Sequence, residues 1–82
     1  MGHLIEVFVT SCPLCREALD IVRKAMCPEC VLKVYNVLEK PHYMEKARSY
    51  GVRALPAIII DGEKAFEGVP SLEEVRRALG TI

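Results

Sequence analysis

A chain of 82 residues, 51% of them hydrophobic, is long enough for one small globular domain with a modest core, and we expect residues 1–82 to form it. Eleven basic and eleven acidic side chains give a net charge of zero, which argues against nucleic acid or an anionic membrane surface as a partner. The N-terminus lacks the apolar segment of a signal peptide and no run approaches a membrane span, so we expect a cytoplasmic protein, in which four cysteines are typical of catalysis or metal binding.

The first predicted element is a strand over Leu4–Val9, which is apolar on both faces as in a buried central strand. Glu6 is its only charged residue. One interpretation is a carboxylate that reaches water near the end of the strand. The other is a partly buried carboxylate beneath the following cysteines, where it could move protons.

A C-P-L-C stretch at residues 12–15 comes after this strand and opens an amphipathic run that predicts a helix over Pro13–Met26. Proline is favoured at the first helical position, so we expect Cys12 to be the N-cap. Free backbone N–H groups and the helix dipole should lower the pKa of its thiol there. Cys15 falls on the apolar face of the helix. The pattern therefore predicts an exposed nucleophile with a sheltered partner, as reversible dithiol chemistry requires.

The later elements are predicted from β-branched runs, turn residues and capping signals. In chain order we predict a strand over Val31–Leu38, a helix from Pro41 to Gly51, strands over Ala57–Ile60 and Lys64–Glu67 joined by the Asp61-Gly62 turn, and a helix from the Ser71 capping box to Gly80. The order β-α-β-α-β-β-α predicts an α/β fold with a four-stranded mixed sheet and helices on both faces.

A second cysteine pair, Cys27 and Cys30, gives the spacing CxxC-x11-CxxC, which is close to that of a zinc ribbon. A continuous first helix would hold Cys15 and Cys27 about 18 Å apart along its axis, too far to share one zinc ion. We therefore expect no metal. Strand residues rather than a helix come after Cys30, so this pair lacks a helix N-terminus. We expect an auxiliary disulfide or two inert thiols rather than a second catalytic pair.

The chain resembles the thioredoxin–glutaredoxin superfamily over nearly its whole length, and within it a small glutaredoxin-like thioredoxin. The C-P-L-C stretch carries one part of the resemblance, and proline after the first cysteine is similar to glutaredoxin. The segment Tyr50–Ile60 is similar to the thioredoxin run that leads into a cis-proline. The resemblance implies a minimal thioredoxin fold and a cis Leu55–Pro56 bond, with the Leu55 backbone pairing with a bound polypeptide. Ser11 stands where thioredoxins have an aromatic residue.

The resemblance also implies a function: a dithiol–disulfide oxidoreductase that reduces protein disulfides. An unidentified reductase or small thiol would reset it, without a metal or organic cofactor. Only part of the turn with which glutaredoxins hold glutathione is present at residues 67–71, which weakens the case for glutathione. A redox-sensing or binding module and, less favoured, a four-cysteine zinc protein are the alternatives. We expect a monomer.

Two expectations about site residues come from the resemblance. Glu6 lies six residues before Cys12, where thioredoxins keep a buried aspartate. It should collect the Cys15 proton, and burial should raise its pKa. The surface that docks the substrate should consist of Ser11, Pro13, Leu14, Leu55, Pro56 and Gly68.

Overall fold

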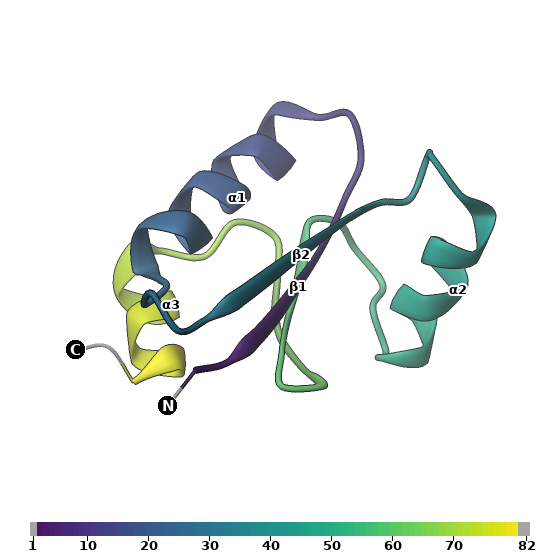
Figure 1. Cartoon of the computed structure of the whole chain (residues 1–82). Helices are drawn as coiled ribbons and strands as arrows, with labels where there is room; N and C mark the ends of the chain where they lie inside the picture. The colour runs from purple at the N-terminus through teal and green to yellow at the C-terminus, as the bar shows by residue number, and fades with distance from the viewer. Residues whose placement is uncertain (1, 81–82) are drawn as a thin grey trace.

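In the computed structural model, which describes residues 2–80, seven elements follow one another in the predicted order (Figure 1). They are β1 (Leu4–Val9), α1 (Pro13–Ala25), β2 (Val31–Asn36), α2 (Pro41–Ser49), β3 (Ala57–Ile60), β4 (Glu63–Glu67) and α3 (Leu72–Leu79).

Most predicted boundaries hold to within a residue, and the larger differences are at the ends of β2 and α2. β2 ends at Asn36 rather than Leu38. The side-chain oxygen of Asn36 accepts a hydrogen bond from the Leu38 N–H over 2.9 Å, and this local turn takes the chain out of the sheet.

The sheet is four-stranded and mixed, as predicted, and its strand order is β2-β1-β3-β4. β1 and β2 are parallel, with Leu4 beside Val31, whereas β3 is antiparallel to both β1 and β4. β1 is therefore paired along both edges, which explains why a nearly continuous apolar sequence forms it.

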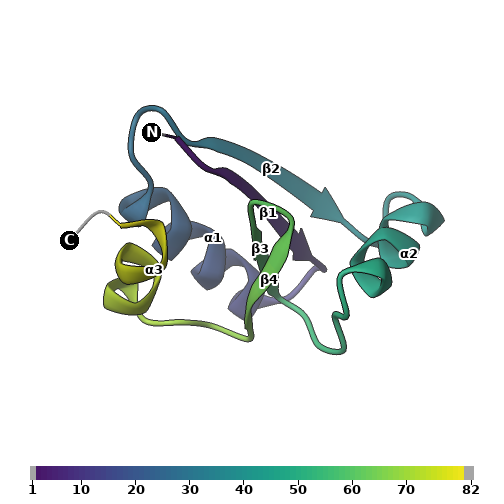
Figure 2. The ribbon, with the colours of Figure 1, turned by 90° about the horizontal axis from the view of Figure 1, so that it is seen from below.

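Two buried clusters lie on opposite faces of this sheet, because successive side chains of β1 alternate between them. Ile5, Val7 and Val9 pack with buried residues of α1 and α3. Phe8 packs with Ala47 of α2 instead. Figures 1 and 2 show α1 and α3 side by side with α2 apart from them, so helices cover both faces, as predicted.

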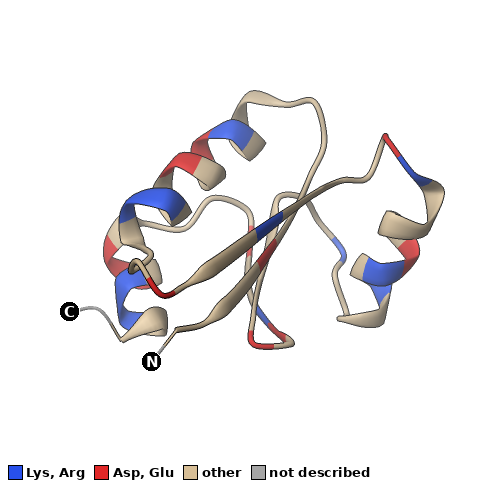
Figure 3. Cartoon of the chain, viewed as in Figure 1, with Lys and Arg blue, Asp and Glu red and all other residues tan. Residues whose placement is uncertain are grey.

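Basic and acidic residues both occur along α1 (Figure 3). Their exposed side chains are Arg16, Glu17, Asp20, Arg23 and Lys24. This helix thus offers no one-sided basic surface. Within residues 2–80, none of the helices combines the length and the apolar character needed to cross a membrane.

Candidate active site

The loop between β1 and α1 holds Cys12 at the N-cap of α1, and Pro13 occupies the first helical turn, as predicted. The Cys12 backbone is extended, with φ −128° and ψ 153°. The backbone N–H of Cys15 donates to Cys12 Sγ over 3.3 Å. The sulfur thus takes the position of the side-chain oxygen that usually caps a helix, at the positive end of the helix dipole.

Cys15 lies on the buried face of α1, also as predicted, and is only 2% exposed. Its sulfur accepts a hydrogen bond from the Thr10 N–H over 3.3 Å. The Cys12 and Cys15 sulfurs are 2.9 Å apart, and both residues are thiols. Cys12 is half-buried beside the exposed Ser11 and Leu14. A partner molecule can therefore reach Cys12 but not Cys15.

The pKa values of the two thiols shift in opposite directions. Hydrogen bonding with the Cys15 side chain, together with backbone N–H groups of Cys15 and Leu14, lowers the pKa of Cys12, and partial burial opposes this only in part. Burial raises the pKa of Cys15, and the hydrogen bond with Cys12 and its negative charge raise it further. The accessible sulfur is thus the one that ionises first.

Glu6 is buried as expected, at 3% exposed, but in a polar environment. The Tyr50 hydroxyl donates to Glu6 Oε1 over 3.0 Å, and Lys46 Nζ is 3.2 Å from Oε2. Burial raises the pKa of Glu6, but hydrogen bonds from Tyr50, Lys46 and Tyr35 outweigh it, so the pKa is lowered. The prediction of a raised pKa is wrong, because these donors stabilise the carboxylate more than burial destabilises it.

The structure also separates Glu6 from Cys15. Glu6 alternates along β1 with Ile5 and Val7, which pack in the Cys15 cluster, and its partners Tyr50 and Lys46 belong to the α2 side. The sheet therefore lies between the carboxylate and the Cys15 sulfur. The six-residue spacing between Glu6 and Cys12 therefore does not place the Glu6 carboxylate beside the Cys15 sulfur.

The residues predicted to dock the substrate differ in exposure. Ser11, Pro13 and Leu14 are exposed, Leu55 and Gly68 are half-buried, and Pro56 is buried. The Leu55–Pro56 bond is cis, as the resemblance implied. The Gly68 N–H donates to the Pro56 carbonyl oxygen over 2.7 Å, which joins two of the predicted residues. A surface pocket beside the cysteines is lined by Ser11, Cys12, Pro13, Arg16 and Asp20, among others.

The second cysteine pair lies at the other end of α1. This helix runs unbroken from Pro13 to Ala25, so the four cysteines cannot gather around one zinc ion, and the zinc alternative fails on geometry. Within the described range, no group of three or more His, Cys, Asp or Glu side chains could hold a metal ion. Cys27 and Cys30 are both thiols, and β2 rather than a helix begins after them, as predicted.

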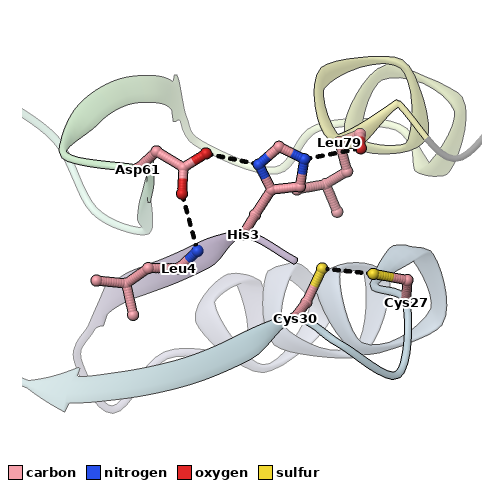
Figure 4. A network of polar contacts seen from close by, with 6 residues as sticks. All are labelled: His3, Leu4, Cys27, Cys30, Asp61 and Leu79. Carbon is pink, nitrogen blue, oxygen red and sulfur yellow. Dashed lines mark hydrogen bonds and ion pairs between the residues drawn. The ribbon is translucent and has the colours of Figure 1, made fainter. Parts of the chain in front are cut away.

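His3 and Asp61 lie beside this second pair, although the sequence has no motif that marks them (Figure 4). The pairing of strands explains their position. Parallel pairing of Leu4 with Val31 sets the preceding residues, His3 and Cys30, next to each other, and antiparallel pairing of β1 with β3 sets Asp61 opposite Leu4. No strand register was predicted from the sequence, so the sequence alone could not find them.

Comparisons with known proteins agree with this architecture. A family model described as the thioredoxin domain matches residues 3–80. A thioredoxin from Methanocaldococcus jannaschii is 37% identical over 79 residues, covering 92% of this chain and 89% of that protein. A probable thioredoxin from Methanothermobacter thermautotrophicus is 42% identical, with the same shares covered.

Solved structures share the fold. A mutant thioredoxin from Halobacterium salinarum has a TM-score of 0.74 and 20% identity, over 96% of this chain and 73% of that one. The NTD_N/C domain of alkylhydroperoxide reductase AhpF from Enterococcus faecalis has a TM-score of 0.79 and 22% identity. Our chain covers only 38% of that longer chain, although 96% of its own residues take part.

Proposed function

Because the chain belongs to the thioredoxin family and is a thiol–disulfide oxidoreductase, we propose that it reduces protein disulfides, with Cys12 attacking and Cys15 resolving. The observation that supports this assignment is the position of Cys12 at the N-cap of α1, where its sulfur is accessible and its pKa is lowered. Cys15 is too deeply buried to meet an external disulfide.

In the first step the Cys12 thiolate attacks one sulfur of the substrate disulfide. A bond forms between Cys12 and that sulfur, the substrate S–S bond breaks, and the other substrate sulfur leaves as a thiolate. The exposed Leu14, Ser11 and Pro13, with the half-buried Leu55 and Gly68, would contact the partner chain. Pro56 would support this surface from below, since its side chain is buried.

The second step requires Cys15 to lose its proton, although its pKa is raised. Once Cys12 is in the mixed disulfide, it carries no negative charge, and its contribution to the raised pKa of Cys15 disappears. The Cys15 proton can then pass to the released substrate thiolate. Cys15 attacks the Cys12 sulfur, which lies 2.9 Å away in the dithiol form, and the second substrate sulfur leaves as a thiolate that takes a proton from solvent. These two steps do not need a carboxylate such as Glu6.

The products are a reduced substrate and a Cys12–Cys15 disulfide. A reductase or small thiol would return two electrons and two protons to this disulfide. A cytoplasmic monomer that works without a cofactor stays a prediction. In a redox-sensing module, the same cysteines would be oxidised once and would not reduce substrate repeatedly.

Two single substitutions test these roles, both made together with Cys27→Ser and Cys30→Ser so that only the first pair can react. With insulin as the disulfide substrate, Cys15→Ser should accumulate a mixed disulfide through Cys12 that reducing agent releases. Cys12→Ser should form no adduct and show no turnover with dithiothreitol as reductant. An adduct trapped by Cys12→Ser but not by Cys15→Ser, as read by mass spectrometry, would reverse the assignment.

A further inference from the structure

The second cysteine pair has the geometry of a dithiol that can close to a disulfide. Cys27 comes after α1, Cys30 precedes β2, and their sulfurs are 3.0 Å apart. The Cys30 N–H donates to the Cys27 carbonyl oxygen over 3.0 Å, which closes a tight turn around the pair. Cys27 is half-buried, whereas Cys30 is only 8% exposed. An external molecule can therefore approach one sulfur but not the other.

The imidazole of His3, shown beside Cys30 in Figure 4, has an acceptor at each ring nitrogen. Nδ1 contacts the Asp61 carboxylate, and Nε2 lies 3.0 Å from the Leu79 carbonyl oxygen. A carboxylate and a carbonyl can only accept hydrogen bonds, so this pair of acceptors favours the imidazolium, and the hydrogen bond with Asp61 raises the pKa of His3. The other oxygen of Asp61 accepts the Leu4 N–H over 2.9 Å, which fixes the carboxylate in place.

The charge of His3 is the smallest of several influences on the pKa of the Cys30 thiol. Burial raises the pKa of Cys30, but the hydrogen bond from Cys27, backbone hydrogen bonds from His3 and Cys27, and the positive charge of His3 together lower it. The first pair has its stabilised thiolate on the accessible sulfur, Cys12. In the second pair the stabilised thiolate is on the sheltered sulfur, so Cys30 is suited to resolve or to leave rather than to attack an external disulfide.

We propose that Cys27 and Cys30 form a second redox-active dithiol, which exchanges with a small-molecule thiol–disulfide couple at Cys27, while the His3–Asp61 pair stabilises Cys30 as resolving and leaving thiolate. A small partner is favoured because the charged Glu29 stands between these cysteines, where the first pair has the exposed apolar Leu14 that would contact a partner chain. This proposal is independent of the roles of Cys12 and Cys15.

The chemistry balances in both directions. In oxidation, Cys27 passes its proton to Cys30 and attacks a disulfide RSSR, which forms a Cys27–SR bond and releases RS⁻. Cys30 then gives up that proton to RS⁻ and attacks Cys27, and the Cys27–Cys30 bond forms as the second R group leaves as RS⁻. The pair, which starts as one thiol and one thiolate, loses two electrons and one proton, and RSSR becomes one RSH and one RS⁻. In reduction, RS⁻ attacks Cys27 and Cys30 leaves as a thiolate, which a low pKa of the leaving group favours. A second RSH then attacks the RS sulfur bound to Cys27, which regenerates RSSR and leaves Cys27 as a thiol.

The positions of the trypsin sites allow the redox state of each cysteine pair to be measured separately in the whole wild-type protein. Trypsin cuts after Arg16, Lys24 and Lys33, so residues 1–16 contain the first pair and residues 25–33 contain the second. The protein is equilibrated with glutathione and its disulfide at a series of ratios, quenched with acid, alkylated and digested. We expect residues 25–33 to convert reversibly between dithiol and internal disulfide. If these residues stay reduced or stay oxidised at every ratio, or stop at a glutathione adduct on Cys27, the proposal is wrong.

Two variants test the His3–Asp61 pair. His3→Gln removes the charge, and Asp61→Asn removes its counter-carboxylate while keeping a residue that tolerates the positive φ of 51° at this turn. Both should shift the equilibrium of the second pair toward the disulfide by at least threefold, which corresponds to about 14 mV. The first pair in the same samples should not move.

His42→Gln is the matched control, because His42 is exposed on α2. Circular dichroism should show that all three variants fold. If His3→Gln and Asp61→Asn match His42→Gln in the equilibrium of residues 25–33, the imidazolium has no role in the redox chemistry of this pair.

Discussion

The substitution Glu6→Gln should lower the stability of the protein without lowering its reductase activity. Glutamine still offers Tyr50 an oxygen that can accept its hydroxyl hydrogen, but it removes the negative charge 3.2 Å from Lys46 Nζ. A hydrogen bond to a charged group contributes about 1.5–3 kcal/mol, and solvent screening at Lys46, whose side chain is 40% exposed, reduces this. We expect a loss of about 1–2 kcal/mol in the free energy of unfolding. For a domain of this size, each kcal/mol lowers Tm by roughly 4–8 °C.

The pH dependence of stability isolates the Glu6 contribution. The folded state lowers the pKa of Glu6, so the unfolded chain binds the proton more readily. The stabilisation is therefore fully present above the ordinary carboxyl pKa and is lost as pH falls through the lowered pKa of the folded state. Urea unfolding at a series of pH values should show wild type and Glu6→Gln converging in acid, with equal m-values throughout. Glu63→Gln, on an exposed side chain of β4, controls for a general change in charge.

The reductase assay decides between a structural and a catalytic Glu6. Because the sheet lies between Glu6 and Cys15, the rate of insulin reduction and the titration of the Cys15 thiol should match those of wild type at a temperature where both proteins are folded. A tenfold loss of rate, or a shifted Cys15 titration, in a folded Glu6→Gln protein would refute the separation argued from the alternation of β1.

Two further changes test the docking surface and the last helix. Leu14→Ser should lower kcat/KM for a protein disulfide by up to about tenfold, because a leucine buried at an interface contributes about 1.5 kcal/mol. The kcat/KM for a small disulfide should stay unchanged. Leu38→Ser is the control, since Leu38 is 67% exposed and lies beyond β2. Equal losses on both substrates would remove Leu14 from docking. Ser71→Ala should cost about 1 kcal/mol in urea unfolding, because Ser71 Oγ accepts the Glu74 N–H over 3.1 Å in the capping box; an unchanged midpoint would show that the cap contributes nothing.

The features of the first site that the sequence predicted correctly depend on neighbours within one helical turn. Proline at position 13 fixes the start of α1, and the start of the helix fixes Cys12 as its cap and Cys15 on its buried face. The parallel direction of β1 and β2 and the antiparallel β3–β4 hairpin were predicted too, because a β-α-β unit has parallel strands and Asp61-Gly62 forms a two-residue turn. Each of these predictions requires only local signals or a general rule of topology.

The predictions that failed or were missing depend on contacts between distant segments. Whether burial or hydrogen bonding controls the pKa of Glu6 depends on Tyr50 and Lys46, which α2 and its C-cap bring to the other face of β1. The His3–Asp61 pair exists only because β1 lies between β2 and β3 in one particular register. Composition and periodicity contain no information about either contact.

The two cysteine pairs share one spacing but differ in chemistry, because a different element begins after each of them. After Cys12 the chain enters a helix, and the helix N-terminus stabilises the first, accessible sulfur. After Cys30 the chain enters β2, so no helix end is available, and His3, which precedes the neighbouring strand β1, lies beside the second, sheltered sulfur instead (Figure 4). A helix cap favours attack on an external disulfide, whereas a sheltered thiolate favours closing and opening a bond to its own partner. The position of the stabilised sulfur, rather than the CxxC spacing, therefore distinguishes the two pairs.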